Sequence, residues 1–173
     1  FDQHVNDWII WLPNFKGYYS PLNIKEVHAY GIETEADLAL RLAKNWKLGV
    51  HSTFAWTPSI NEGEPMSSAD QSLGKQLPYV PEYSATLSGR LSYRRWSLLY
   101  TMTSNKKTLT GHLPHYLMSN VTLEKGFSLR WADLSLKGTV NNLFNEEYLS
   151  VLSRPMPGIN FEFFIGITPK WGK

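Results

Sequence analysis

The sequence predicts an all-β fold, an antiparallel transmembrane β-barrel to which this chain contributes about eight strands. Three observations predict this class. Apolar and polar residues alternate along most of the chain, as they do on strands whose two faces meet different surroundings. The connections between the alternating runs are short and long in turn, which is typical of outer-membrane barrels. Phe, Trp and Tyr make up 14% of the 173 residues, as expected where rings with a polar edge lie at a membrane boundary.

Composition and charge exclude several other classes. The net charge is +2 without runs of like charge, so we expect no nucleic-acid partner. The absence of cysteine excludes disulfide scaffolds, zinc–thiolate sites and cysteine nucleophiles. No stretch approaches the roughly 18 consecutive apolar residues of a transmembrane helix, the longest being Trp8 to Leu12. The chain begins without Met and without a signal-peptide pattern, so we expect it to be a portion of a longer product.

Eight alternating runs are predicted as strands. The run at 81–93 shows the pattern most clearly, because Leu87 and Leu91 lie on one face and Ser88 and Arg90 on the other. The runs cover roughly residues 2–12, 23–42, 46–57, 81–93, 96–104, 115–127, 132–149 and 158–171.

Residues 35–46 also fit a helix, because Leu38, Leu42 and Trp46 recur at every fourth position. The alternation from Ile32 to Leu42 is in phase with Tyr30, however, and we therefore predict one long strand in this region.

The connections predict which ends of the strands lie together. Short links are expected near Lys44–Asn45, Arg94–Arg95 and residues 126–131, at one end of the barrel. Long loops are expected at the other end, at residues 13–22, 58–80, 105–114 and 150–157.

The apolar face is predicted to meet lipid, and its aromatic residues to form girdles at the two membrane boundaries. The polar face carries Glu33, Glu35, Asp37, Arg90 and Lys137, which suits a wet or plugged lumen. The alternative is a soluble barrel with its apolar face inside. The predicted girdle residues are Trp56, Tyr83, Tyr93, Trp96, Tyr100 and Trp171.

No catalytic, cofactor or metal site is predicted. His112 and His115 lie three apart in a loop that contains Pro114, and the sequence offers no third ligand nearby. The acidic loop Asn61–Asp70 does not have the spacing of a calcium loop. His28 and His51 lie on different strands without an evident partner.

Aromatic residues in the loops are the better candidates for ligand or partner contacts, because flat rings stack on large ligands and anchor partner proteins. The alternative is that they pack the loops against one another. The candidates are Trp11, Phe15, Tyr18, Tyr19 and Tyr79.

One segment near the end of the chain, "VNNLFNEEY" followed by "PMPG", resembles the C-terminal signature of the TonB-dependent outer-membrane receptors. Ile159 stands where an arginine is common in that family. We expect the asparagines of this segment to hydrogen-bond a turn rather than to do chemistry. The matching residues are Asn141, Asn142, Leu143, Phe144, Asn145, Tyr148, Pro157 and Gly158.

Two further stretches resemble the same family. "GIE", residues 31–33, is similar to the end of a loop-to-strand descent, and Gly74, Leu77, Pro78 and Pro81 are similar to a Gly-x-x-Leu-Pro-x-x-Pro strand entry. The resemblance implies that residues 1–173 are the C-terminal portion of a barrel of about 22 strands, without the plug domain and its TonB box. The two open edges of such a portion, Phe1–Leu12 and Gly158–Trp171, would need partner strands.

The resemblance also implies a function: energised uptake of a scarce, bulky nutrient through the outer membrane of a Gram-negative cell. It implies as partners the N-terminal barrel and plug, TonB–ExbB–ExbD acting through the plug, outer-membrane lipid and a surface lipoprotein lid. Residues 7–31 are similar to cobalamin receptors of the BtuB type, so cobalamin is the favoured ligand and a ferric siderophore or haem is next. The alternatives are a complete eight-stranded structural or adhesion protein and an outer-membrane hydrolase acting through a lumenal carboxylate such as Glu33.

Overall fold

The computed structural model describes residues 1–14, 16–65, 68, 71–107, 115–151 and 154–170. These residues form strands joined by turns and loops. None of the described residues belongs to a helix that is long and apolar enough to cross a membrane.

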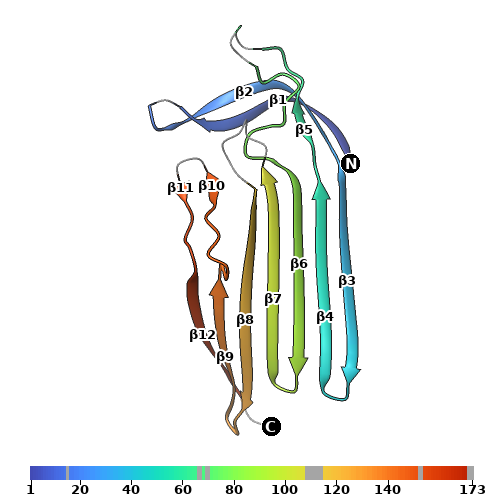
Figure 1. Ribbon diagram of the computed structural model, residues 1–173, viewed down its shortest axis with the longest axis vertical. Coiled ribbons are helices and arrows are strands. Elements are labelled where there is room, and N and C mark those ends of the chain that lie inside the picture. The colour runs from blue at the N-terminus through green and yellow to red at the C-terminus, as the bar shows by residue number, and fades with distance from the viewer. Residues whose placement is uncertain (15, 66–67, 69–70, 108–114, 152–153, 171–173) are drawn as a thin grey trace.

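Seven long strands form one antiparallel sheet (Figure 1). In spatial order they are β12 (Asn160–Pro169), β9 (Ala132–Asn141), β8 (Tyr116–Ser128), β7 (Trp96–Lys107), β6 (Pro81–Tyr93), β4 (Trp46–Trp56) and β3 (Ile32–Ala43). Strand β3 confirms that residues 35–43 are extended rather than helical.

A three-stranded sheet lies across one end of this sheet (Figure 1). It consists of β1 (Asp2–Pro13), β2 (Tyr19–Tyr30) and β5 (Ser59–Asn61), with β2 in the middle. A small hairpin of β10 (Leu149–Val151) and β11 (Arg154–Pro155) lies on the way to β12. We call the end of the seven-stranded sheet that carries these elements the loop end. The opposite end, with the short turns near Asn45, Arg95 and Arg130, is the turn end.

The prediction of one long strand at 23–42 was wrong, because the chain changes sheets at Gly31. A Cβ at this position would overlap the carbonyl oxygen of Trp56, so only glycine allows the two backbones to come this close. Before Gly31, the Tyr30 N–H donates to the carbonyl of Pro58, so β2 leaves the line of β3 and pairs with β5.

Two other boundaries differ from the prediction. The loop expected at 13–22 is shorter than predicted. Pro13 of β1 already pairs with Tyr19 of β2, so the two strands form a hairpin. The strand expected at 132–149 ends at Asn141, where the next residue, Asn142, has a φ of 51° and leaves the extended conformation.

The edges of the seven-stranded sheet are β12 and β3. Strand β12 is the edge that was predicted at 158–171. The other predicted edge, at 1–12, was wrong, and β3 takes its place. The reason is the change of sheet at Gly31, since β1 follows β2 into the three-stranded sheet. Within the described part of the chain, β3 pairs only with β4 and β12 only with β9.

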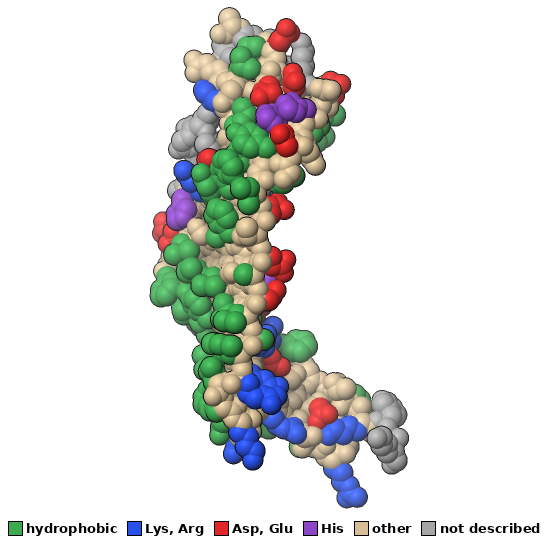
Figure 2. All heavy atoms as spheres, turned by 90° about the vertical axis from the view of Figure 1, so that its right-hand side faces the viewer, with side chains coloured by type: hydrophobic (Ala, Val, Ile, Leu, Met, Phe, Trp, Pro, Cys, Tyr) green, Lys and Arg blue, Asp and Glu red, His purple; other side chains and the backbone are tan. Residues whose placement is uncertain are grey.

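The strand register confirms that the seven-stranded sheet has one apolar and one polar face. Directly paired residues share a face, so the pairs Leu48–Leu91 and Leu91–Leu98 continue one apolar row across neighbouring strands. Figure 2 shows hydrophobic side chains along one side of the sheet and acidic side chains along the other. Apolar side chains are exposed on the edge strand β12 as well, where Phe163 is 87% exposed.

Most of the predicted girdle residues lie on the apolar face at strand ends. Trp56 pairs with Tyr83 at the loop end, and Tyr93 pairs with Trp96 at the turn end. Tyr100 shares the face but lies inside β7, where its hydroxyl is 2.9 Å from the Ser119 hydroxyl. Trp171 lies outside the described residues. Contact of this face with lipid stays a prediction.

The lipid contact can be tested at two neighbouring positions of β6. The Leu87→Arg variant places a charge on the apolar face, where a basic residue at the midplane of a bilayer costs about 2–4 kcal/mol. The Ser88→Arg variant places it on the polar face, near Thr101. We expect Leu87→Arg to reduce strongly the amount of heat-modifiable, membrane-assembled protein, and Ser88→Arg to leave it close to the wild-type amount. Equal losses would contradict the assignment of the faces.

Candidate functional site

The three-stranded sheet is the candidate site, because it brings together segments that are far apart in sequence. Strand β2 pairs with β1 through most of its length, and Val27 and Ala29 pair with Asn61 and Ser59 of β5. The N–H groups of Glu62 and Gly63 both donate to the carbonyl of Glu26. The start of the 58–80 connection is therefore fixed against β2 by backbone hydrogen bonds.

A small apolar cluster supports this sheet. Val27 is fully buried, Leu77 is 1% exposed and Ile24 is 8% exposed, and Leu22 and Val80 pack around them. The Leu77 N–H donates to the carbonyl of Ser59 at 2.8 Å. Leu77 thus holds the end of the 58–80 connection under the sheet, which explains the leucine of the Leu-Pro stretch.

The predicted loop aromatics separate into two groups. Trp11, Tyr18 and Tyr19 all belong to the β1–β2 hairpin, with exposed fractions of 59%, 55% and 36%. Tyr79 instead lies half-buried in the 58–80 connection and has a φ of 62°. Phe15 lies outside the described residues. The hairpin therefore presents a set of exposed rings, and their contact with a ligand or partner stays a prediction.

The hairpin also presents a ring that the prediction missed. Trp8 of β1 is 37% exposed and was not among the predicted loop aromatics. At the tip of the hairpin, the guanidinium of Arg154 lies 6.0 Å from the centre of the Tyr19 ring. This contact links the β10–β11 hairpin to the β1–β2 hairpin.

A histidine cluster, which we define as Asp2, His4, His28 and Glu62, lies where β1, β2 and the residue after β5 meet. His4 and His28 are direct cross-strand partners, and their rings stack with centroids 4.0 Å apart. His28 Nε2 lies 2.7 Å from Asp2 Oδ1, and His28 Nδ1 lies 3.4 Å from Glu62 Oε1. His28 thus has carboxylate partners on both ring nitrogens, although no partner for it was predicted from the sequence.

The electrostatics of the histidine cluster follow from these contacts. The hydrogen bond to Asp2 raises the pKa of His28, against the desolvation of the ring, which lowers it. The negative charges of Asp2 and Glu62 add to the increase. Figure 2 shows histidine side chains surrounded by acidic ones at the loop end. Three separate segments supply these groups, so no local spacing in the sequence predicted the cluster.

A second group of titratable side chains lies on the polar face of the seven-stranded sheet. We call it the β3–β4 cluster, and it consists of Glu35, Asp37 and His51. His51 Nδ1 is 2.9 Å from Asp37 Oδ1 and 3.9 Å from Glu35 Oε1. His51 and Asp37 are direct cross-strand partners, which explains the contact.

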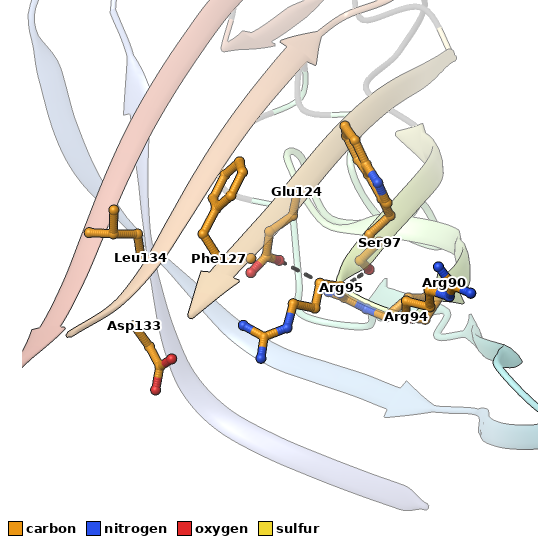
Figure 3. A pocket seen from close by; sticks show the side chains of 11 residues that line it. Arg90, Arg94, Arg95, Ser97, Glu124, Phe127, Asp133 and Leu134 are labelled. Carbon is orange, nitrogen blue, oxygen red and sulfur yellow. Dashed lines mark hydrogen bonds and ion pairs between the residues drawn. The ribbon is translucent and has the colours of Figure 1, made fainter. Parts of the chain in front are cut away.

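A pocket at the turn end is lined by basic and acidic side chains (Figure 3). The Arg90 Nη1 donates to the Ser97 Oγ at 2.8 Å and lies 3.9 Å from Glu124 Oε2. Arg95 also lines the pocket. Glu124 of β8 is thus paired with the guanidinium of Arg90 on β6, across the intervening strand β7.

The signature segment is a hydrogen-bonded turn, as its sequence predicted. Asn142 is only 2% exposed, and its Oδ1 accepts the N–H of Glu146 at 2.8 Å. Its Nδ2 donates to the carbonyl oxygens of Glu146 at 2.9 Å and Pro157 at 3.3 Å. Its own N–H donates to Asn120 Oδ1 at 2.9 Å, so one asparagine ties the end of β9 to β8 and to the start of β12.

The other signature residues complete this turn. Asn145 Oδ1 accepts the N–H of Ile159 at 2.9 Å, and a Cβ at Gly158 would lie only 2.5 Å from the same atom. The Tyr148 ring packs against Tyr116 with centroids 4.7 Å apart, and burial raises the pKa of Tyr148. Phe144 is 69% exposed and takes no part in the network.

The two loops that were considered for metals are only partly described. His115 Nε2 lies 3.0 Å from the Ser104 hydroxyl, whereas His112 is outside the described residues. In the acidic loop, Glu62 belongs to the histidine cluster, and Asp70 is outside the described residues.

The chain matches the model of a known protein family. The model of a family described as TonB dependent receptor-like, beta-barrel matches residues 1–143, which reach from β1 into the signature segment. No curated protein matches the chain.

The role of the signature turn can be tested at Asn142. The Asn142→Gly variant keeps a backbone that tolerates the positive φ but removes the side-chain hydrogen bonds. It leaves buried backbone groups without partners, so we expect a loss of about 1–3 kcal/mol in the free energy of unfolding. Urea unfolding of the full-length, detergent-solubilised protein measures this loss.

The matched control is Asn6→Ala, at an exposed position of β1. Its effect should stay within about 0.5 kcal/mol, as for most surface substitutions. An Asn142→Gly variant as stable as this control would show that the signature asparagine does not hold the turn.

Proposed function

Because the chain belongs to the TonB-dependent receptor family, we propose that it forms the C-terminal section of the barrel of an outer-membrane receptor for a scarce, bulky nutrient. The family consists of outer-membrane transporters and is not a family of enzymes. The observation that carries the proposal is the seven-stranded sheet, with its apolar face, its polar face and its two edges, which have no further partner strand among the described residues.

The dimensions of the strands support a role as part of the barrel wall. The seven strands contain from 10 residues in β9 to 13 in β6, and about 9–11 residues of a tilted strand span the hydrocarbon core. The polar side chains that share the other face, such as Thr122 and Thr139, bond to one another across strands. Such a face suits a wet or plugged lumen.

The contacts of Phe1 support continuation of the sheet beyond β3. The Phe1 amino group donates to the carbonyl of Gly31, and the Gly31 N–H donates to the carbonyl of Phe1. This pairing lies at the point where β2 passes into β3, so a strand in line with β1 would lie along the open edge of β3. We propose that residues 1–173 form one section of a barrel of about 22 strands. The plug and the remaining strands would come from the rest of the receptor.

In this mechanism the chain provides wall and loops, and no catalytic residue. The ligand binds from outside to the loops and the plug. TonB, with ExbB and ExbD, then pulls on the plug and opens a path along the polar face. The exposed rings of the β1–β2 hairpin contact the ligand or a surface lipoprotein lid.

Cobalamin is the proposed cargo, with a ferric siderophore or haem next. The support is the resemblance of residues 7–31 to cobalamin receptors, together with the exposed rings of Trp11, Tyr18 and Tyr19. Aromatic rings stack well on the large, flat faces of a macrocycle.

Growth on a sole corrinoid, haem or ferric siderophore source, with and without the receptor, identifies the cargo. We expect loss of the receptor to abolish growth on the corrinoid at limiting concentration.

Binding of the corrinoid to the solubilised receptor tests the hairpin. The Trp11→Ala variant removes a ring that is 59% exposed, and we expect the binding free energy to weaken by about 2 kcal/mol, or roughly thirtyfold in Kd.

The matched control is Trp131→Ala, which removes an equally exposed tryptophan (61%) at the turn end. It should leave the affinity unchanged. If growth depends on the receptor only when haem or a ferric siderophore is the source, that compound and not cobalamin is the cargo. Growth independent of the receptor on every source would contradict the uptake function.

A further inference from the structure

We propose that Asp2, His4 and His28 bind a divalent transition-metal ion, best matched by Zn²⁺, at the point where β1 and β2 join the seven-stranded sheet. The inference goes beyond nutrient uptake and does not depend on it. The donor atoms of the three side chains lie within 4.8 Å of one another. They come from two paired strands, so the backbone ladder fixes their relative positions.

The pairing of the strands explains why the donors converge. His4 and His28 are direct cross-strand partners, and Asp2 lies two residues before His4, on the same face of β1. A tetrahedral zinc ion with bonds of about 2.0–2.2 Å holds its ligand atoms roughly 3.4 Å apart. The side chains of Asp2 and His4 are 71% and 57% exposed and are free to rotate the short distance that this requires.

The two nitrogens of His28 suit different roles. Nε2 lies 2.7 Å from Asp2 Oδ1 and is the atom that would bind the metal, whereas Nδ1 lies 3.4 Å from Glu62 Oε1. A histidine that binds a metal through one nitrogen is typically held by a carboxylate at the other nitrogen, which fixes its tautomer and ring orientation. Glu62 is a positioning residue of this kind, and its own backbone N–H is held by the carbonyl of Glu26.

The donor set favours zinc over the alkaline-earth ions. Two imidazoles and one carboxylate are the ligands of many zinc sites that keep a fourth position open, whereas Ca²⁺ and Mg²⁺ take oxygen ligands. The β3–β4 cluster has a single imidazole and two carboxylates, so it offers zinc a poorer donor set.

A bound ion would join β1 to β2 close to Gly31, where the three-stranded sheet meets the seven-stranded one. Through Glu62 it would also engage the start of the 58–80 connection. The metal would therefore hold β1, β2 and the residue after β5 together at the base of the aromatic β1–β2 hairpin.

The test is Zn²⁺ binding by the chelator-stripped, detergent-solubilised receptor, followed by isothermal titration calorimetry. We expect one saturable site, with His4→Gln and His28→Gln each lowering the affinity by at least about 100-fold. Glu62→Gln should lower it by about 10- to 100-fold, as is typical when the carboxylate behind a liganding histidine is removed. Bound Co²⁺ should show the visible absorption of a four-coordinate site in the wild type and lose it in His4→Gln.

Two histidines elsewhere serve as controls. His115→Gln and His51→Gln remove imidazoles outside the cluster and should leave the affinity for Zn²⁺ unchanged. Loss of binding in His51→Gln but not in His4→Gln would move the site to the β3–β4 cluster and overturn the proposal. Equal affinity in the wild type and His4→Gln, or a wild type that binds Ca²⁺ as tightly as Zn²⁺, would also overturn it. His4 is exposed, so its variant tests the site even if His28→Gln fails to fold.

Discussion

Backbone hydrogen bonds between neighbouring strands determine how this chain is arranged. In a hydrocarbon environment every N–H and C=O group needs a partner inside the protein, and a sheet supplies these partners only where another strand lies beside it. The five inner strands of the seven-stranded sheet have partners on both sides, whereas β3 and β12 are each paired on one side. The fixed register then decides which side chains share a face, and it aligns the apolar residues of all seven strands.

The same constraint explains the two places where the chain leaves the regular sheet. At Gly31, where the backbone lies close to the carbonyl of Trp56, the chain passes from the three-stranded sheet, in which β2 pairs with β5, into the seven-stranded sheet. After Asn141 the side chain of Asn142 provides hydrogen bonds that a neighbouring strand would otherwise provide. It bonds the N–H and the carbonyl of Glu146 and the carbonyl of Pro157. One departure builds the three-stranded sheet with its exposed rings and histidine cluster, and the other leads the chain toward its last strand.

Much of the sheet could be predicted from the sequence, because alternation of apolar and polar residues reports the two faces of a strand directly. The run at 81–93 became β6, and the asparagines of the signature became turn residues with the hydrogen bonds expected of them. The break at Gly31 escaped prediction because the alternation continues across it, and only the nearby Trp56 backbone makes glycine necessary there. The histidine cluster also escaped prediction, since its members become neighbours only after β1, β2 and β5 have paired.

We infer that the sheet formed by this chain is completed by further strands of a wider barrel. The most direct measurement is the heat-modifiable electrophoretic mobility of residues 1–173 refolded alone in detergent, compared with the whole receptor. The two edges have no further partner strand in the described part of the chain and should prevent the isolated chain from closing, so we expect a heat-modifiable band for the receptor and none for the chain alone. A stable, heat-modifiable monomer of residues 1–173 would contradict it.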